Sequence, residues 1–441
     1  MQISRTVTLF SSLAVVVAAI GIGILVTRPL GPVVSDVIFG SPVISPNADG
    51  QFDLTTISYR IWREARVSIT FEDAQGNQYI FRQNETRTFG EYSVLFAGVV
   101  EGYVKPNEIV HGAVVSRLMP DGDYQWVVAA TDAETGKTDV IKGSLTISQS
   151  DVELPDLLEF TISPETFTPN QDGLDDRVLI NVFVPKRAEL TVYLVDSAGR
   201  QYFVPESPQS RLAGDKGRHT FDYEAGVDLG NSPPPDGMYT VRVEARDAEG
   251  QIVRRSSQLA IKNGGVPLAE ISAQPVGDTV TFNREQVKLG DVLTFTLTVE
   301  NYGDAPIRTT GPYPGYVYEQ SATFPSTGFY EESGAWRVGI NCDTCLTDYP
   351  WRWALASPDK LTPLTDEDGR VHYYLMPGER AVVSGSIRLT NIVPSRNPQQ
   401  FWAGLIHEDV EIAPLNDRVD PHWIEIFEGE LPPPLTPTPT P

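Results

Sequence analysis

Cysteine, histidine and basic side chains are scarce in this chain of 441 residues. It has two cysteines, five histidines, and 34 lysines and arginines against 58 aspartates and glutamates. The resulting formal charge of −24 repels phosphate backbones and argues against nucleic acid as a partner. The histidines are scattered, and no G-x-S-x-G, H-E-x-x-H or phosphate-binding glycine loop occurs. We therefore expect no enzyme and name no catalytic residue.

Long apolar runs are also scarce, and the single example lies at residues 6–27. This run contains "LFSSLAVVVAAIGIGILV", has no charged side chain, and is preceded by Arg5 and followed by Arg28. As a helix it would measure about 33 Å, enough to span a bilayer core. We expect a short flank at 1–5 and a single-pass signal anchor at 6–27, with the bulk of the chain extracytoplasmic at the cell membrane. A cleaved leader or plain secretion is the alternative.

The two cysteines are close together in "CDTC", at Cys342 and Cys345. In an exported chain a local disulfide is the default, whereas in the cytosol a redox or metal pair would be. Zinc requires four ligands, and no second pair accompanies this one. The sequence therefore predicts a Cys342–Cys345 disulfide.

Three blocks of sequence occur twice in the same order, which indicates a duplication. "SPNADGQFD" at 45–53 matches "TPNQDGLDD" at 168–176, and the strand-like segments that follow also align. "PDGDYQWVVAATDAETG" later matches "PDGMYTVRVEARDAEG". The offset between the copies falls from 123 to 115, because the first copy has eight more residues in its middle loop.

Each copy alternates polar with apolar residues, as in "RVSITFED" and "ELTVYLVD", and has glycine at its turns. Period-two alternation with short spacing and no helical period predicts an all-β protein built from β-sandwiches. The final "LPPPLTPTPTP" favours an extended polyproline II tail. The expected units are 33–150, 156–263, 266–428 and a Pro/Thr-rich tail at 429–441.

The duplicated unit resembles the Ig-like domain of the flagellar hook-capping protein. A strand ending in "D..G", a wide loop and then "P-D-G-x-Y" carry this resemblance, and Gly122, Gly237, Tyr124 and Tyr239 match the family's turn glycine and following aromatic. The opening "PN-x-D-G" resembles the start of gliding-motility-type C-terminal modules. These resemblances imply a scaffold without catalytic residues.

The third unit resembles CARDB-like adhesion-related sandwiches. "LGDVLTFTLTVENYGDAP" and the later "PGERAVVSGSIRLTN" carry that resemblance. A long insertion at 311–370 departs from the family pattern. Together the resemblances imply three Ig-like β-sandwich domains in tandem, and the apolar run places one N-terminal transmembrane helix before them.

The repeated opening motif supports two interpretations. Its oxygen-bearing side chains have a spacing that suits Ca²⁺, although the bidentate glutamate of an EF-hand is missing. Alternatively, the Asn and Asp side chains accept hydrogen bonds from backbone N–H groups in a turn before the first strand. The candidate ligands are Asn47, Asp49, Asp53, Asn170, Asp172 and Asp176. No other cofactor is expected.

The insertion at 311–370 is rich in aromatic residues. Tyr330, Trp336, Trp351 and Trp353 are the candidate ligand or partner residues, because aromatics with polar tips offer rigid area to sugars and peptides. The alternative is that these rings pack the insertion onto its own sandwich.

We expect a membrane-anchored structural or adhesion protein that projects its terminal sandwich toward other surface or envelope proteins or a polysaccharide. A carbohydrate- or peptide-binding module that uses the aromatic insertion is one alternative. An accessory subunit of an envelope complex is another.

Overall fold

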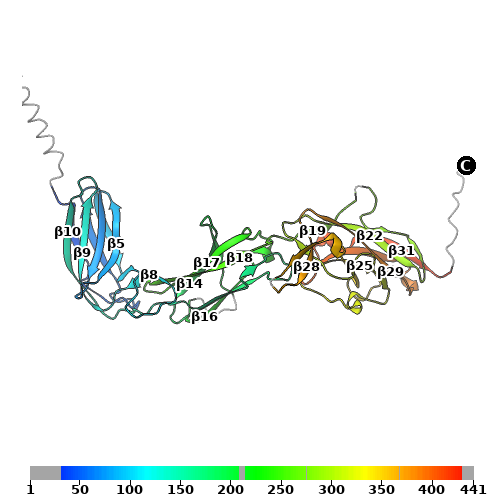
Figure 1. Ribbon diagram of the computed structural model, residues 1–441, viewed down its shortest axis with the longest axis horizontal. Helices are drawn as coiled ribbons and strands as arrows, with labels where there is room; N and C mark the ends of the chain where they lie inside the picture. Colours follow the sequence, from blue (N-terminus) through cyan, green and yellow to red (C-terminus); the bar gives the residue numbers. More distant parts are fainter. Residues whose placement is uncertain (1–30, 208–213, 275, 367, 430–441) are drawn as a thin grey trace, which may run out of the picture.

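The computed structural model describes residues 31–207, 214–274, 276–366 and 368–429. These residues form an all-β protein in which the only helical segments are short 3₁₀ turns. Figure 1 shows three domains in a row. The strands of the first domain run at a steep angle to the line through the other two. Within the described residues no helix is long and apolar enough to cross a membrane. The expected anchor at 6–27 lies outside them.

Domain 1 is a sandwich of a three-stranded sheet, in the order β1-β3-β6, and a five-stranded sheet, in the order β2-β10-β9-β4-β5. Alternate side chains of each strand enter the core between the sheets, as in β3, where every second residue is buried. The strands are β1 Val34–Phe39, β2 Val43–Ile44, β3 Thr55–Ile61, β4 Ala65–Glu72, β5 Gln78–Arg87, β6 Gly90–Phe96, β9 Gly122–Asp132 and β10 Thr138–Ile147.

Domain 2 repeats this topology. Its three-stranded sheet has the order β11-β13-β16, and β12-β18-β17-β14-β15 corresponds to the five-stranded sheet of domain 1. A 3₁₀ turn, η1 Val227–Leu229, follows the three-stranded sheet. The strands are β11 Leu158–Ser163, β12 Thr166–Phe167, β13 Val178–Val184, β14 Glu189–Val195, β15 Gln201–Val204, β16 Gly217–Tyr223, β17 Gly237–Arg246 and β18 Ile252–Ile261.

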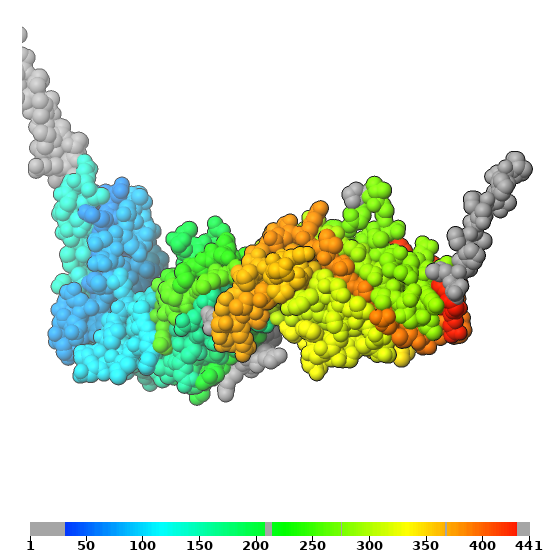
Figure 2. All heavy atoms as spheres, turned by 45° about the vertical axis from the view of Figure 1, so that its right-hand side comes forward, coloured from blue at the N-terminus to red at the C-terminus, as the bar shows by residue number. Residues whose placement is uncertain are grey.

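The longer middle loop of domain 1 joins this domain to domain 2. This loop contains β7 (Val99–Glu101) and β8 (Ala113–Leu118), which pair with each other. Strand β8 also pairs antiparallel with β18 of domain 2, so a single sheet runs across the boundary. Figure 2 shows this cyan segment lying against the green surface of domain 2.

Domain 3 is a larger sandwich. One sheet has the strand order β19-β22-β29-β24, and β20 also pairs with β22. The facing sheet has the order β21-β31-β30-β25-β26. A small third sheet has the order β23-β28-β27. The strands are β19 Ala269–Ile271, β20 Thr281–Phe282, β21 Gln286–Lys288, β22 Val292–Asn301, β23 Ile307–Arg308, β24 Val317–Glu319, β25 Trp336–Cys342, β26 Trp351–Ala354, β27 Thr362–Thr365, β28 Val371–Leu375, β29 Arg380–Arg388, β30 Gln399–His407 and β31 Val419–Phe427. The 3₁₀ turns are η2 Phe324–Thr327, η3 Pro358–Lys360, η4 Pro394–Arg396 and η5 Pro414–Asn416.

The segment expected as an insertion, 311–370, supplies strands to the main sheets. Strand β25 lies between β30 and β26, and all seven of its residues are buried. Strand β24 pairs parallel with β29 in the opposite sheet. The segment is therefore part of the framework of domain 3, because its apolar residues fill the space between the two sheets.

Candidate functional site

The opening loop of domain 1 is a turn held by its own side chains. Asn47 Oδ1 accepts the Asp49 N–H at 3.1 Å, and Asp49 Oδ1 accepts the Gln51 N–H at 2.8 Å. Asp53 accepts the N–H groups of Asn47 and Gly50 at 3.2 and 2.7 Å. These oxygens satisfy backbone donors ahead of β3, which is the geometry of the turn interpretation.

The second copy has the same bonds. Asn170 Oδ1 accepts the Asp172 N–H at 3.0 Å, and Asp172 Oδ1 accepts the Leu174 N–H at 2.9 Å. Asp176 accepts the N–H groups of Asn170 and Gly173 at 3.2 and 2.6 Å. The duplication therefore preserved this turn in detail. Calcium binding by either loop stays a prediction.

The two loops differ in their surroundings. Asp49 is exposed, whereas Asp172 is buried. A Cβ added at Gly50 would meet no atom within 4 Å, but one added at Gly173 would lie 1.9 Å from the carbonyl oxygen of Ser333 in domain 3. Both glycines have positive φ, +84° and +82°, so their conformation is the same. The second loop has been used to contact the next domain.

Three side chains of domain 3, Arg308, Tyr374 and His407, form what we call the docking face. Arg308 Nε donates to the carbonyl oxygen of Asp172 at 2.7 Å, and the Tyr374 hydroxyl donates to Asp172 Oδ2 at 2.7 Å. His407 Nε2 lies 2.8 Å from the carbonyl oxygen of Gln171. In Figure 2 an orange segment of domain 3 lies over the green surface of domain 2.

The docking contact perturbs several ionisable groups. Burial raises the pKa of Asp172. Burial and the neighbouring Asp172 carboxylate raise the pKa of Asp176 to about 7. Burial, reinforced by the positive charge of Arg308, lowers the pKa of His407 to about 4. The imidazole is therefore neutral at physiological pH and donates through Nε2.

The repeated "P-D-G-x-Y" motif fixes where the chain leaves each unit. The Tyr124 and Tyr239 hydroxyls donate to the carbonyl oxygens four residues earlier, at 2.6 and 2.5 Å. Asp121 accepts two backbone N–H groups just after β10, at 2.9 and 2.8 Å, and Asp236 accepts two just after β18, at 2.8 and 3.0 Å. The motif thus orients the connection to the following domain, a role that sequence reasoning missed.

Side-chain bonds strengthen the boundary between domains 1 and 2. Gln251 of domain 2 accepts the Leu118 N–H of β8 at 3.2 Å and donates to the carbonyl oxygen of Asp151 in the connection at 3.0 Å. Lys186 pairs with both Asp151 and Asp247 at 2.9 Å. Gln251 and Asp247 are buried, so their bonds are shielded from water, whereas the Asp151 side chain is 40% exposed.

The three candidate tryptophans of domain 3 belong to its core. Trp336, Trp351 and Trp353 are buried, and Trp353 packs edge-on against Phe295 with ring centroids 4.8 Å apart. Only Tyr330, at 67% exposure, could meet a partner directly. The tryptophans therefore present no open aromatic face, and the structure matches the packing alternative.

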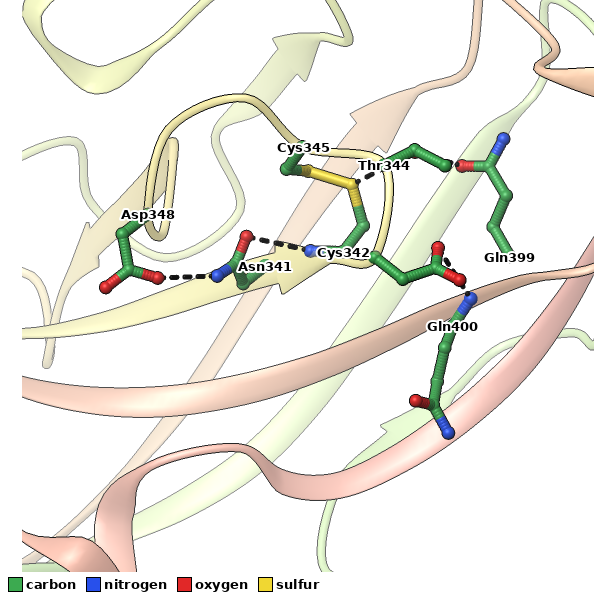
Figure 3. The surroundings of a disulfide bond; sticks show 8 residues. Asn341, Cys342, Thr344, Cys345, Asp348, Gln399 and Gln400 are labelled. Carbon is green, nitrogen blue, oxygen red and sulfur yellow. Dashed lines mark hydrogen bonds between the residues drawn. A yellow bond between two sulfur atoms is a disulfide. The ribbon is translucent and has the colours of Figure 1, made fainter. Parts of the chain in front are cut away.

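The predicted disulfide between Cys342 and Cys345 is present. It closes a short turn after β25 (Figure 3). The Asn341 side chain accepts the Cys342 N–H at 2.9 Å and donates to Asp348 at 2.7 Å, and Thr344 donates to Gln399 at 2.9 Å. The turn is consequently fixed from both sides.

A cleft of about 400 Å³ lies beside the disulfide. The disulfide and Trp351 contribute to its lining, and Leu346 on its rim is fully exposed. Hydroxyl and amide groups make up much of the remaining lining: Gln320, Ser321, Thr323, Thr344, Thr347, Thr390 and Asn391. A cleft lined by a tryptophan, a disulfide and hydrogen-bonding side chains suits a peptide or a sugar.

One cluster of possible metal ligands brings together residues that are far apart in the sequence. Asp278, Asp420 and His422 place ligand-type atoms within 4.8 Å of one another, and they are the only such group of three found in the described part of the chain. Asp420 also accepts the Val280 N–H at 2.8 Å, so one of its oxygens has a structural role.

No family model and no curated protein match the chain. Solved structures that match include tandem repeats from the extending region of a large adhesion protein, at 15% identity over 85% of this chain and 71% of that chain, with a TM-score of 0.18. Chicken CNTN1 FN1-FN3 domains match at 8% identity over 89% and 99%, with a TM-score of 0.21. The N-terminal four Ig domains of Dscam1 isoform 6.44 match at 11% over 89% and 72%, with a TM-score of 0.16. At such TM-scores the likeness carries no argument.

Proposed function

We propose that this protein is a membrane-anchored extracytoplasmic spacer that projects domain 3 from the cell surface for adhesion or for contact with another surface protein. The observation that carries the proposal is that hydrogen bonds cross both domain boundaries. Strand β8 extends the sheet of domain 2, and the docking face of domain 3 holds the opening loop of domain 2. A chain of independent binding modules would need no such bonds.

Hydrogen bonds across the domain boundaries make a spacer stiff. Domains joined by loose linkers move relative to one another by default unless their interface is substantial. Here the connections after β10 and β18 are also held by Asp121 and Asp236. The orientation of domain 3 relative to domain 1 is therefore set by the fold.

Distances between spin labels on domains 1 and 3 test the spacer. Cysteines introduced at the exposed positions Gln75 and Asp368 would carry the labels, because the native cysteines are joined to each other. Pulsed electron resonance should give one narrow distance distribution. A broad distribution, like that of a flexible linker, would contradict the proposal.

The membrane anchor is tested separately on the full chain. Alkaline carbonate should leave the protein in the membrane fraction, and protease added to intact cells or spheroplasts should degrade residues beyond 31. Release by carbonate would contradict anchoring, but it would leave the spacer geometry standing.

A second candidate function is peptide or carbohydrate binding in the cleft beside the disulfide. The fully exposed Leu346 next to a fixed turn favours this role, because a rigid site loses little entropy on binding. Binding of the full chain to purified cell-wall polysaccharide and to immobilised peptides should weaken in Leu346→Asp and stay unchanged in Leu229→Asp, an exposed site on domain 2. Equal binding by both variants would exclude the cleft.

A further inference from the structure

We propose that Trp62 and Phe89 form an aromatic tip of domain 1 that lies in the interfacial layer of the membrane. This inference rests on the proposed anchor at 6–27. Trp62 directly follows β3, and Phe89 directly precedes β6. The two rings are in contact, with centroids 6.3 Å apart, and they are 42% and 69% exposed.

The tip lies where the chain enters domain 1. The Trp62 N–H donates to the carbonyl oxygen of Val33 at 3.1 Å. Its neighbour Arg63 donates to the carbonyl oxygens of Gly31 and Pro32 at 3.2 and 3.3 Å. The first described residues of the chain are therefore fixed directly against the turn that carries Trp62.

The reach of the chain then limits how far the tip can lie from the bilayer. From Thr27 to Gly31 there are four steps between Cα atoms, which span at most about 14 Å when fully extended. A hydrocarbon core of about 30 Å inside a bilayer of about 40–45 Å leaves headgroup layers of roughly 5–8 Å. An anchor that ends at Thr27 therefore keeps this end of domain 1 at or near the headgroups.

The second copy of the domain provides an internal comparison. The last residue of β3 pairs with the first residue of β6, and the last of β13 pairs with the first of β16. The positions equivalent to Trp62 and Phe89 are therefore Pro185 and Lys216. Of two copies with the same topology, only the one that follows the anchor carries aromatics at this end.

The tip has the chemistry and the rigidity of an interfacial contact. The indole N–H of Trp62 donates to Ser35 Oγ at 2.8 Å, so the polar atom of the ring already has a partner within the domain. The Tyr92 hydroxyl both accepts from and donates to the backbone of Thr88, at 3.1 and 3.0 Å, and so fixes the turn before Phe89. Aromatic rings are enriched at the headgroup level, where apolar and polar surroundings meet.

A depth measurement on the full chain tests the inference. Phe89→Cys would carry a thiol-linked fluorophore in phosphatidylcholine vesicles that contain lipid spin-labelled near the headgroup. Phe52→Cys is the matched control, because Phe52 is 72% exposed and lies in the opening loop at the opposite end of domain 1. We expect at least about threefold stronger quenching at position 89 than at position 52.

The outcomes separate this inference from the anchor. Equal and weak quenching at both positions in protein that resists alkaline carbonate would overturn the tip while the anchor stands. Release by carbonate would overturn the anchor and the tip with it. A label at Thr135, in the turn between β9 and β10 at the same end, isolates the aromatics. Its quenching should fall when Trp62→Ser and Phe89→Ser are added, and unchanged quenching would overturn their role.

Discussion

Two aspartates with the same local geometry have different roles in this protein. Asp49 and Asp172 each accept the N–H two residues ahead, in turns that share four side-chain hydrogen bonds. Asp49 is exposed, but Asp172 also accepts from Tyr374 in another domain. The contribution of a polar side chain to stability thus depends on its burial and its partners, since leaving a buried acceptor without its donor costs free energy.

Replacing Tyr374→Phe should weaken the boundary between domains 2 and 3. The change removes the hydroxyl donor and leaves a buried carboxylate oxygen of Asp172 without it. We expect a loss of about 1–3 kcal/mol in the free energy of unfolding, measured by urea denaturation. Tyr330→Phe is the control, because that ring is exposed. Equal stability of the two variants would show that the bond contributes nothing.

His407→Gln should reduce the acid sensitivity of the same boundary. The pKa of His407 is lowered to about 4 in the folded protein. Between pH 6.5 and 4 the unfolded chain therefore binds a proton that the folded chain does not, so acidification destabilises the fold. Glutamine can still donate to the Gln171 carbonyl but does not titrate. Denaturation midpoints from pH 7 to 4 should fall more steeply for the wild type than for the variant.

Asp176 acts in the opposite direction over the same range. Its pKa is raised to about 7, so its stabilising contribution is present at low pH and is lost as pH rises toward 7. The pH dependence of wild-type stability is therefore the sum of opposing contributions from His407 and Asp176. The comparison of His407→Gln with wild type isolates the histidine, and a constant difference between their profiles at every pH would contradict its role.

Trp353→Ala should destabilise domain 3 without creating a selective binding defect. Trp353 is fully buried, and its indole N–H donates to the carbonyl oxygen of Tyr316 at 3.1 Å. Removing a buried tryptophan typically costs about 3–5 kcal/mol through lost contacts and a cavity. Thermal melting followed by near-ultraviolet circular dichroism measures this loss. A stable variant that lost only partner capture would restore the aromatic-site interpretation.

At the scale of elements, strand β8 decides how domains 1 and 2 meet. The approach of β8 to β18 requires glycine at position 112, because a Cβ there would lie 2.6 Å from the carbonyl oxygen of Arg254. Gly112→Ala should push the strands apart and broaden label-to-label distances between domains 1 and 2. Gly40→Ala is the control, since its Cβ would meet nothing closer than 3.7 Å. Unchanged distances in Gly112→Ala would mean that β8 does not fix the boundary.

The strands that alternate were predictable from sequence, and those that depend on distant partners were not. "RVSITFE" and "ELTVYLV" have a period of two because one face of each is buried. The eight extra residues of domain 1 were visible as a longer loop, but the partner of β8 lies more than a hundred residues away. "WRVGINC" alternates in the same way, yet all seven residues of β25 are buried, so the cover over its polar face was not predictable from the sequence.

The site residues divide in the same way: a local pair was predictable from the sequence, and a group from distant strands was not. The adjacent Cys342 and Cys345 indicated their own bond, because the two residues are local. The docking face was missed, because Arg308, Tyr374 and His407 come from three separate strands. Each is an ordinary polar residue in the sequence, and only the fold places them opposite the second opening loop.

At the scale of the whole molecule, the bonded boundaries make neighbouring domains depend on one another. Arg308 is buried and donates to the carbonyl oxygens of Asp172 in domain 2 and Ser333 in domain 3, both at 2.7 Å. Such a side chain joins the stability of one sandwich to that of the next. Domains 2 and 3 should therefore unfold together, although each has its own core.

Arg308→Ala should separate that shared transition into two. The change leaves the carbonyl oxygen of the buried Asp172 and that of Ser333 without this donor and removes the attraction between the domains. Differential scanning calorimetry of the wild type should show domains 2 and 3 in one peak, and the variant should show an earlier peak resolved from a later one. Arg388→Ala is the matched control, because that side chain is 43% exposed and pairs with Glu319 at 3.2 Å within domain 3. A single unchanged peak in Arg308→Ala would mean that the domains are adjacent but energetically independent, and the stiffness of the spacer would then have to come from the connecting segments alone.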